Sequence, residues 1–317
     1  MDRPGEWSLH LGLPKAASTL LQRHLFGCHP DLDYLGKLKA KWVSPEVGKF
    51  VRCITTGQGL DESLAVRMRE AYIEPAIRRG RLPLLSNEGL TAGLAEVHRR
   101  RAEFFKQIWS PCKVFFFVRH PLGLVESMYF HRLRQYARKG KGPDVRDRLG
   151  PRPYFEVEEW LEANLALEEG IFNLLDYART IQVYDRILGR ENVGVFLFED
   201  AVRDAEATIQ KLCCYLGISP ARDLDLDDGR PVNPRWTEQQ VERLKQINSS
   251  RWRRVLFRAM GRRRRDRMLA PEGAGPPARL DWSASGWAEK IEKRTAGGNR
   301  WLAEAFGLPL ARFNYPL

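Results

Sequence analysis

The chain has 317 residues, of which 43% are hydrophobic and 29% are charged, and this composition excludes a disordered or fibrous protein. The formal net charge of +12 indicates an anionic partner, such as nucleotide phosphates, acidic glycans, lipid headgroups or nucleic acid. No stretch of about 18 residues is apolar and uncharged, so no membrane-spanning helix is expected. The first residues include Asp2, Arg3 and Glu6, and no apolar stretch of the kind found in secretory signals follows them.

Short apolar runs alternate with stretches of helical spacing. In chain order we expect strand Ser8–Leu11, helix Thr19–Phe26, helix Glu62–Arg79, strand Leu82–Leu85, helix Val97–Ile108, strand Val114–Val118, helix Leu122–Tyr136, helix Val157–Ile187, strand Val193–Phe198 and helix Ala205–Leu216. The strands are nearly continuous apolar runs, which is typical of strands covered on both faces. The pattern therefore predicts a three-layer α/β fold, with a mostly parallel central sheet flanked by helices.

The composition changes after about residue 222. Asp223–Pro234 is predicted to be a loop, Trp236–Met260 a basic helix, and residues 261–278 a mobile basic segment that contains the arginines 262–265. Arg300–Phe306 is expected to be a last short helix, ended by a glycine and a proline. We interpret the whole chain, 1–317, as one domain with an α/β core over 8–222 and a helical and loop part over 223–317.

The five cysteines form a scattered set without a C-x-x-C pair; they are Cys28, Cys53, Cys112, Cys213 and Cys214. Such a set is typical of buried thiols in a reducing compartment, so we expect a cytoplasmic location.

The first candidate site lies where the expected strand Ser8–Leu11 runs through Gly12–Thr19 into a helix. Backbone N–H groups at a helix start have no partner within the helix and lie at the positive end of its dipole, so they bind anions. Lys15 adds a positive charge there, and Ser18 and Thr19 add hydroxyl donors. The segment therefore predicts a cradle for a phosphate or sulfate.

A simpler interpretation of the same segment is also open. Thr19 and Gln22 fit a capping box, in which Thr19 only begins the helix and Lys15 is a solvated loop lysine. The segment matches neither the Walker A pattern nor G-x-G-x-x-G.

The second candidate site follows the expected strand Val114–Val118. Arg119 comes directly after this strand, at the sheet edge where open α/β sheets bind ligands, and Ser127 lies about two turns into the next helix. A guanidinium and a hydroxyl together suit a second phosphate. The alternative is a structural salt bridge of Arg119 and a solvated Ser127.

Taken together, the two segments resemble sulfotransferases. Pro14–Gln22 resembles the 5′-phosphosulfate loop, P-K-S/A-G-S/T-T-x-L-Q, and Arg119–Tyr129 resembles the 3′-phosphate motif, R-N/D-P-x-D/E-x-x-x-S-x-Y. Asn192–Gly217 and Asn299–Ala303 are also similar to stretches of bacterial members. The resemblance implies a P-loop-like α/β fold. It covers most of the chain, with the acceptor-binding parts matched least.

Three departures from the family pattern stand out. Ala17 replaces a glycine of the first motif, and His120 and Gly123 replace usual residues of the second. The C-terminal adenosine loop of the family, R-K-G-x-x-G-D-W, is missing, so the segment that covers the adenine is unassigned.

The resemblance implies that a sulfonyl group moves in line from 3′-phosphoadenosine 5′-phosphosulfate (PAPS) to an acceptor hydroxyl, giving 3′-phosphoadenosine 5′-phosphate (PAP) without a metal. The acceptor would be a carbohydrate, a glycolipid or a small molecule. Lys15 would bind the 5′-phosphate and the bridging oxygen as a catalytic residue, and Arg119 and Ser127 the 3′-phosphate. The implied donor-binding residues are Lys15, Ala16, Ala17, Ser18, Thr19, Arg119 and Ser127.

A general base should take the proton of the acceptor. Glu88 is the candidate, because it follows the expected strand Leu82–Leu85 at the same sheet edge as Lys15 and Arg119. Its other interpretation is a first-turn carboxylate beside Asn87 as helix N-cap. Among the histidines, His10 is expected to be a core residue, and His98 and His120 are weaker candidates for the base.

Two rival functions are a P-loop-type nucleotide kinase and a basic nucleic-acid-binding protein. The first is disfavoured by the missing Walker A pattern, and no zinc-finger or RRM signature supports the second, so we expect no nucleic-acid partner. The basic segment after residue 236 could guide an acidic glycan or contact an anionic membrane surface, although a solvated charged face is the default interpretation.

Overall fold

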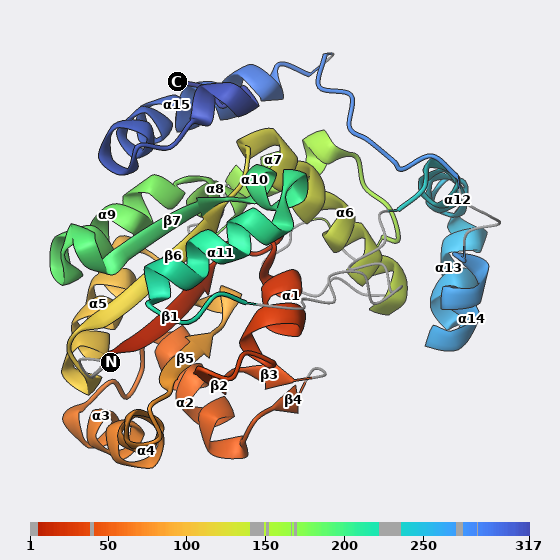
Figure 1. Cartoon of the computed structure of the whole chain (residues 1–317). Helices are drawn as coiled ribbons and strands as arrows, with labels where there is room; N and C mark the ends of the chain where they lie inside the picture. The colour runs from red at the N-terminus through yellow and green to blue at the C-terminus, as the bar shows by residue number, and fades with distance from the viewer. Residues whose placement is uncertain are drawn as a thin grey trace. The chain divides into compact units, whose positions relative to one another are not determined.

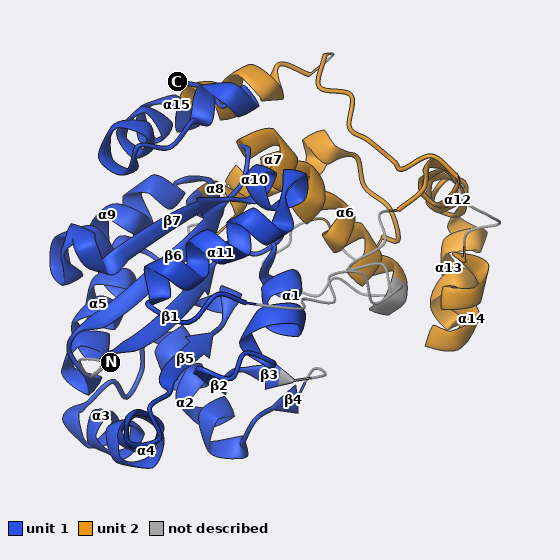
Figure 2. Cartoon of the chain, in the orientation of Figure 1, with its two compact units in different colours: residues 1–120, 173–232, 295–317 blue, residues 121–172, 233–294 orange. Residues whose placement is uncertain are grey.

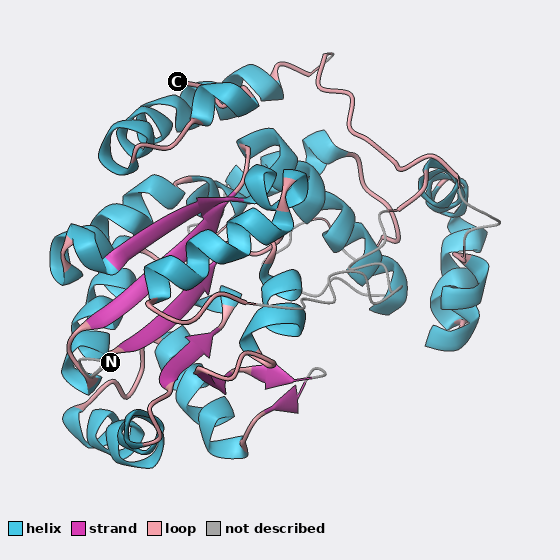
Figure 3. Ribbon diagram, viewed as in Figure 1, coloured by secondary structure: helices cyan, strands magenta, loops and turns pink. Residues whose placement is uncertain are grey.

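The computed structural model describes residues 6–38, 41–139, 149, 152–165, 167, 170–221, 236–270, 275–283 and 285–317. In this part of the chain, five parallel strands form the central sheet, in the order β2-β5-β1-β6-β7 (Figures 1 and 3). The strands are β1 (Trp7–Gly12), β2 (Leu32–Leu35), β5 (Leu82–Ser86), β6 (Cys112–Val118) and β7 (Val193–Leu197).

The four expected strands are confirmed, and so is the parallel α/β class. The prediction missed β2, a short edge strand that pairs with β5, and it extended β7 by one residue, because Phe198 begins a helix. A separate two-stranded hairpin, β3 (Lys37–Leu38) and β4 (Lys41–Trp42), was not expected either.

The side chains of β6 explain the layers on either side of the sheet. Phe115 packs against Phe26 and Tyr215 on one face, whereas the next residue, Phe116, packs against Tyr184 on the other. Successive side chains of a strand point to opposite faces of the sheet. A continuous run of apolar residues therefore packs against the helices on both faces.

The chain divides into two compact units, shown in different colours in Figure 2. Unit 1 comprises residues 1–120, 173–232 and 295–317 and contains the sheet, and unit 2 comprises residues 121–172 and 233–294. The units interleave along the sequence. That the whole chain is one domain, with a core over 8–222 and a C-terminal part over 223–317, stays a prediction.

The helices of unit 1 are α1 (Ser18–Leu21), which continues as the π-helical turn η1 (Gln22–Phe26), α2 (Pro45–Thr56), α3 (Glu62–Met68), η2 (Arg69–Ile73), α4 (Glu74–Arg78), η3 (Glu88–Thr91), α5 (Ala95–Ile108), α9 (Tyr177–Leu188), η4 (Arg190–Asn192), α10 (Phe198–Arg203), α11 (Ala205–Leu216) and η5 (Leu310–Phe313). Those of unit 2 are α6 (Pro121–Lys139), α7 (Val157–Leu165), α12 (Glu238–Asn248), α13 (Arg251–Ala259) and α14 (Arg262–Met268). The helices α8 (Ile171–Leu175) and α15 (Trp287–Phe306) include residues of both units.

The single helix predicted over 157–187 is wrong, because the structure has α7, α8 and α9 there. Asn164 explains the first break. Its side chain donates to the carbonyl of Trp160 (2.8 Å) and accepts the N–H of Ile171 (3.2 Å), so it takes the place of helical bonds at the end of α7.

Two predictions for the C-terminal third also change. Residues 236–260 form two helices, α12 and α13, which are separated by two serines, and serine competes with the helix for backbone hydrogen bonds. Residues 262–268, expected within a mobile segment, form α14. The expected loop 223–234 lies outside the described residues.

None of the helices described has both the length and the apolar character needed to cross a bilayer.

Candidate functional site

The loop between β1 and α1 is the first candidate site. Gly12 has a φ of +103°, and a methyl group on it would lie 3.2 Å from the Cα of Glu88. Lys15 (φ +64°) and Ala17 (φ +65°) also adopt the left-handed conformation, which costs energy in any residue except glycine. The loop is therefore held in an unusual conformation, tightly against the end of β5.

The end of this loop has the backbone geometry of an anion cradle. Ala17 is left-handed and is the N-cap of α1, and Ser18, the next residue, is the first residue of the helix. When a residue in the left-handed conformation adjoins one in the right-handed conformation, their backbone N–H groups point to the same side and can bind one anion. The positive end of the helix dipole lies at the same place and also favours an anion. The N-cap residue is an alanine, whose side chain has no oxygen that could cap the helix start. The backbone donors thus fit a phosphate or sulfate.

The capping-box interpretation of Thr19 and Gln22 is wrong. The helix begins one residue earlier, and the amide of Gln22 donates to the hydroxyl of Ser86 at the end of β5 (3.1 Å). The hydroxyl of Ser18 is buried and donates to the carbonyl of Leu13 (3.3 Å). Ser18 therefore uses its side-chain donor to close the loop, so the hydroxyl that was expected to bind an anion is engaged within the loop.

Lys15 is half-buried, Ala16 is fully buried and Thr19 is half-buried, so the loop sits on the core with its lysine at the surface.

His10, in the middle of β1, is a core residue as expected. Its Nδ1 lies 2.9 Å from the hydroxyl of Ser86, and its ring stacks on Phe115. Burial lowers the pKa of His10 to about 3, because the charged form would lose its hydration. The imidazole is therefore neutral at physiological pH.

Glu88 lies beside the loop, directly after β5. Asn87 is the N-cap of η3 as expected, and its side chain accepts the N–H of Gly89 (3.1 Å). Glu88 is exposed, and among the described residues no hydrogen bond or ion pair of its carboxylate is found. Both interpretations of Glu88 are compatible with this position, a first-turn carboxylate and a base at the same edge as the loop.

Arg119 directly joins the two sequence motifs. Its Nη1 donates to the carbonyl oxygen of Lys15 (2.9 Å), and its guanidinium lies over the ring of Phe198 at 4.3 Å. The residues that follow β1 and β6 thus meet at one edge of the sheet, which is the edge expected for a ligand site in a parallel α/β fold.

A network that the sequence analysis did not find holds the chain next to Arg119. The N–H of His120 donates to Oε1 of Glu199 (2.9 Å), and the hydroxyl of Tyr315 donates to Oε2 (2.8 Å). His120 Nε2 also donates to the carbonyl of Asn314 (2.9 Å). The ring of His120 is therefore used to hold the C-terminal segment, which argues against it as the general base.

The network continues through Asn299 of α15. Asn299 is buried, accepts from the hydroxyl of Tyr177 (2.6 Å) and donates to the carbonyl of Pro316 (2.9 Å). The sequence held one signal for this network, because Asn299–Ala303 and the stretch that contains Glu199 are each similar to stretches of bacterial sulfotransferases. That similarity did not indicate that Asn299 and Glu199 belong to the same network.

His98 is also excluded as a base, because it is buried in α5 beside Tyr184 and Arg101. Burial lowers its pKa to about 4. Arg101 itself is buried and donates to the carbonyls of Ile54 (2.7 Å) and Leu90 (2.8 Å), so this cluster belongs to the packing of α5.

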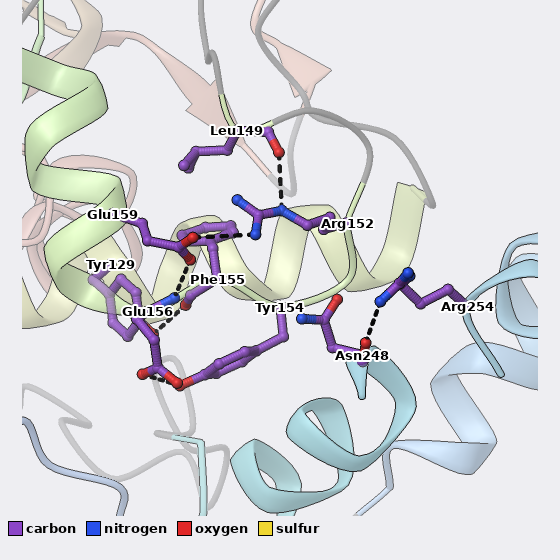
Figure 4. A network of polar contacts seen from close by, with 9 residues as sticks. All are labelled: Tyr129, Leu149, Arg152, Tyr154, Phe155, Glu156, Glu159, Asn248 and Arg254. Atoms are coloured by element: carbon purple, nitrogen blue, oxygen red, sulfur yellow. Dashed lines mark hydrogen bonds and ion pairs between the residues drawn. The ribbon is translucent and has the colours of Figure 1, made fainter. Parts of the chain in front are cut away.

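Ser127 lies on α6, in unit 2, and is half-buried. Its pairing with Arg119, which belongs to unit 1, stays a prediction. Tyr129, the last residue of the second motif, is buried and donates to the carbonyl of Phe155 (2.8 Å), so it anchors α6 (Figure 4). Burial raises the pKa of Tyr129 far above its usual range.

Residues 152–159 make further polar contacts beside this anchor (Figure 4). Arg152 contacts Glu159 at 3.1 Å, and Tyr154 donates to Glu156 at 2.6 Å. The hydroxyl of Tyr154 is therefore engaged in a local contact.

Across the described part of the chain, no group of three or more His, Cys, Asp or Glu side chains is arranged to hold a metal ion.

No family model and no curated protein matches this sequence. Solved structures that are similar to it include a sulfotransferase from Alicyclobacillus acidocaldarius, with 18% identity, a TM-score of 0.49, and coverage of 74% of this chain and 88% of that one. Another is the sulfotransferase domain of the Synechococcus PCC 7002 olefin synthase, with 17% identity, a TM-score of 0.40 and coverage of 86% and 98%. A third is a mouse sulfotransferase complexed with PAP, with 14% identity, a TM-score of 0.36 and coverage of 96% and 85%. All three are sulfotransferases, the family that the two sequence motifs resemble.

Proposed function

We propose that this protein is a sulfotransferase, which moves a sulfonyl group from PAPS to an acceptor hydroxyl and releases PAP. The observation that carries the proposal is the hydrogen bond from Arg119 Nη1 to the carbonyl of Lys15. These residues come from two motifs that lie roughly a hundred residues apart in the sequence, and they were assigned to the two anionic ends of one donor molecule. Their meeting at one sheet edge supports that pairing.

The donor needs a site with two centres of positive charge, one for each phosphate. Lys15 and the N–H groups at Ala17 and Ser18 would bind the 5′-phosphate and the bridging oxygen. As the bridging bond breaks, negative charge grows on the leaving group, and a lysine already in place stabilises it without reorganisation. Arg119 has five N–H donors, so it can hold the Lys15 carbonyl and also bind the 3′-phosphate, together with Ser127.

Glu88 is our candidate for the general base. The acceptor oxygen forms a bond to sulfur while the bond between sulfur and the bridging oxygen breaks, and PAP leaves with the electron pair. The proton of the acceptor hydroxyl would pass to the carboxylate of Glu88. Its exposed position beside Gly12 supports this role, because the acceptor must reach it from solvent.

The acceptor is a carbohydrate, a glycolipid or a small molecule with a hydroxyl group. All five cysteines are unpaired thiols, but only Cys112 and Cys213 are buried as expected, whereas Cys28 and Cys214 are exposed and Cys53 is half-buried. Unpaired thiols are typical of a reducing compartment, and we therefore keep a cytoplasmic location as part of the proposal. A screen with labelled PAPS against glycans, lipids and phenols would identify the acceptor class.

The test compares the binding of PAP and of AMP, which lacks the 3′-phosphate, by calorimetry. Wild-type protein should bind PAP well and AMP weakly. Arg119→Ala should weaken PAP by about 10- to 100-fold, the loss expected for a charge-assisted contact, and should change AMP much less. Lys15→Ala should weaken both ligands and reduce turnover strongly.

Arg99→Ala is the matched control, because Arg99 is an exposed arginine of α5 that pairs with Glu96 and Glu103. It should leave both affinities unchanged. Equal losses of PAP and AMP in Arg119→Ala would contradict the 3′-phosphate assignment, and near-normal turnover of Lys15→Ala would contradict the leaving-group role. Release of ADP from ATP would favour a nucleotide kinase. Nucleic-acid binding that depends steeply on salt and is unchanged by Lys15→Ala would favour a basic nucleic-acid-binding protein.

A further inference from the structure

Helix α13 exposes large apolar side chains. Trp252 is 83% exposed, Leu256 62% and Val255 49%. At about 100° per residue these three side chains fall within an arc of about 100°, and Phe257 points away from that arc. Phe257 is buried, so α13 packs on unit 2 through one face and presents an apolar stripe on another.

Arginines flank this stripe. Arg251 and Arg258 border it on one side and Arg253 on the other, and all three are exposed. The following helix, α14, adds four exposed arginines and one acid, Asp266, which lies 3.8 Å from one of them; these arginines are Arg262, Arg263, Arg264 and Arg267. The surface of α13 is therefore apolar along a line with arginines on both sides, and the neighbouring helix α14 adds further positive charge to this part of unit 2.

Hydrogen bonds fix these helices within unit 2. Gln240 of α12 donates to the carbonyl of Leu269 (2.6 Å), and Arg243 donates to the carbonyl of Met268 (3.1 Å), at the end of α14. Arg254 of α13 donates to the carbonyl of Asn248, at the end of α12 (2.5 Å, Figure 4). The apolar stripe thus belongs to an anchored helix, and burying Trp252 costs little further ordering of the backbone.

The chemistry of this surface selects its partner. A polyanion such as an acidic glycan or a nucleic acid would use the arginines and would stack a sugar or a base on Trp252, but it would gain little from Val255 and Leu256, which have no aromatic ring. An anionic bilayer uses both, because the tryptophan and leucine enter the boundary between headgroups and acyl chains while arginines bind lipid phosphates and carboxylates. We propose that α13 and α14 form a docking surface for an anionic lipid bilayer, with Trp252 and Leu256 as its apolar anchors.

The test is co-sedimentation of the full chain with vesicles. One set contains phosphatidylcholine with about one quarter phosphatidylserine, and the other contains phosphatidylcholine alone. Wild-type protein should bind the anionic vesicles at least about tenfold more tightly than the neutral ones, and this binding should weaken as salt rises. The double variant Trp252→Glu, Leu256→Glu should lose at least about tenfold of the affinity for anionic vesicles.

Trp252→Phe keeps an aromatic anchor and should retain most of the binding. A control for the added charge is the single variant Val202→Glu, which introduces one of the two negative charges of the double variant at another apolar residue, 69% exposed, on α10 of unit 1; it should bind like wild type. Denaturant unfolding curves that coincide for all variants show that the fold is intact.

The proposal is overturned if the double variant binds anionic vesicles like the wild type, or if Val202→Glu loses as much affinity. Equal binding of wild type to neutral and anionic vesicles overturns it as well. If heparin or single-stranded DNA binds in a way that depends on the arginines but not on Leu256, and vesicles do not bind, the surface is a polyanion site and no membrane anchor.

Discussion

Two neighbouring alanines in the loop after β1 should respond in opposite ways to the same substitution. Ala17 has a φ of +65° and a ψ of −2°, in the left-handed region. Ala16 lacks a positive φ, and its methyl group is fully buried. We expect Ala17→Gly to stabilise the protein and Ala16→Gly to destabilise it.

The magnitudes follow from the two backbone conformations. A left-handed alanine costs roughly 1–2 kcal/mol that glycine does not incur, and glycine loses about 0.4–1 kcal/mol through the greater entropy of the unfolded chain. Ala17→Gly should therefore raise the free energy of unfolding by about 0.5–1 kcal/mol. Ala16→Gly loses the burial of one methyl group, about 0.8 kcal/mol, plus the same entropy, which gives about 1.5 kcal/mol of destabilisation.

The assay is unfolding in guanidinium chloride followed by tryptophan fluorescence. The two variants should differ by about 2 kcal/mol, which is about 30-fold in the unfolding equilibrium constant. Ala17→Gly should also keep PAP affinity, because glycine is the residue of the similar sulfotransferase motif at this position. If both variants shift the midpoint in the same direction, the left-handed conformation of Ala17 does not carry the cost assigned to it.

The remaining predictions concern the base and the buried histidines. Glu88→Gln should bind PAP like the wild type and turn over at least about 100-fold more slowly, the usual contribution of a general base; an unchanged rate would move the base elsewhere. Burial lowers the pKa of His10 to about 3 and that of His98 to about 4, below the 6.5 of an unperturbed histidine, so the unfolded chain takes up protons first as the pH falls. The stability that these two histidines contribute should therefore be present above pH 6.5 and be lost as the pH falls below it, by about 1.4 kcal/mol for each histidine, or about 2.8 kcal/mol in total, between about pH 7.5 and 5.5. His10→Gln keeps only the contribution of His98, so unfolding curves at the two pH values should show about half of the total loss.

The central strands were predictable because their sequences carry the signal themselves. The run over Val114–Val118 is apolar at every position. A strand that is buried on both faces needs apolar residues at every position, so this pattern predicts a central strand. β2 contains Asp33 and Tyr34 in only four residues, so its pattern is too short and too polar to stand out. Its identity depends on its partner, since β5 completes its hydrogen bonds and Arg79 pairs with Asp33.

The helix ends were less predictable than the helices. Helix α7 ends where the side chain of Asn164 accepts the N–H of Ile171. The spacing of apolar residues along the sequence does not indicate such a contact. The same holds for α1, where Thr19 and Gln22 have the right spacing for a capping box and Gln22 instead reaches Ser86 on β5. A short motif predicts which residues are near one another in the chain, and tertiary contacts decide which of them pair.

The residues of the candidate site show why some long-range pairs were still predictable. In a parallel sheet every strand runs in the same direction, so the residues that follow each strand meet at one edge. Lys15 follows β1, Glu88 follows β5 and Arg119 follows β6, and the structure indeed places the Lys15 carbonyl against Arg119 and Gly12 against Glu88. The contact of Glu199 with Tyr315 spans 116 residues and has no such rule, because the C-terminal segment follows no strand. The sequence therefore locates the groups that the sheet itself brings together, while the network that holds His120 beside them has to be seen in three dimensions.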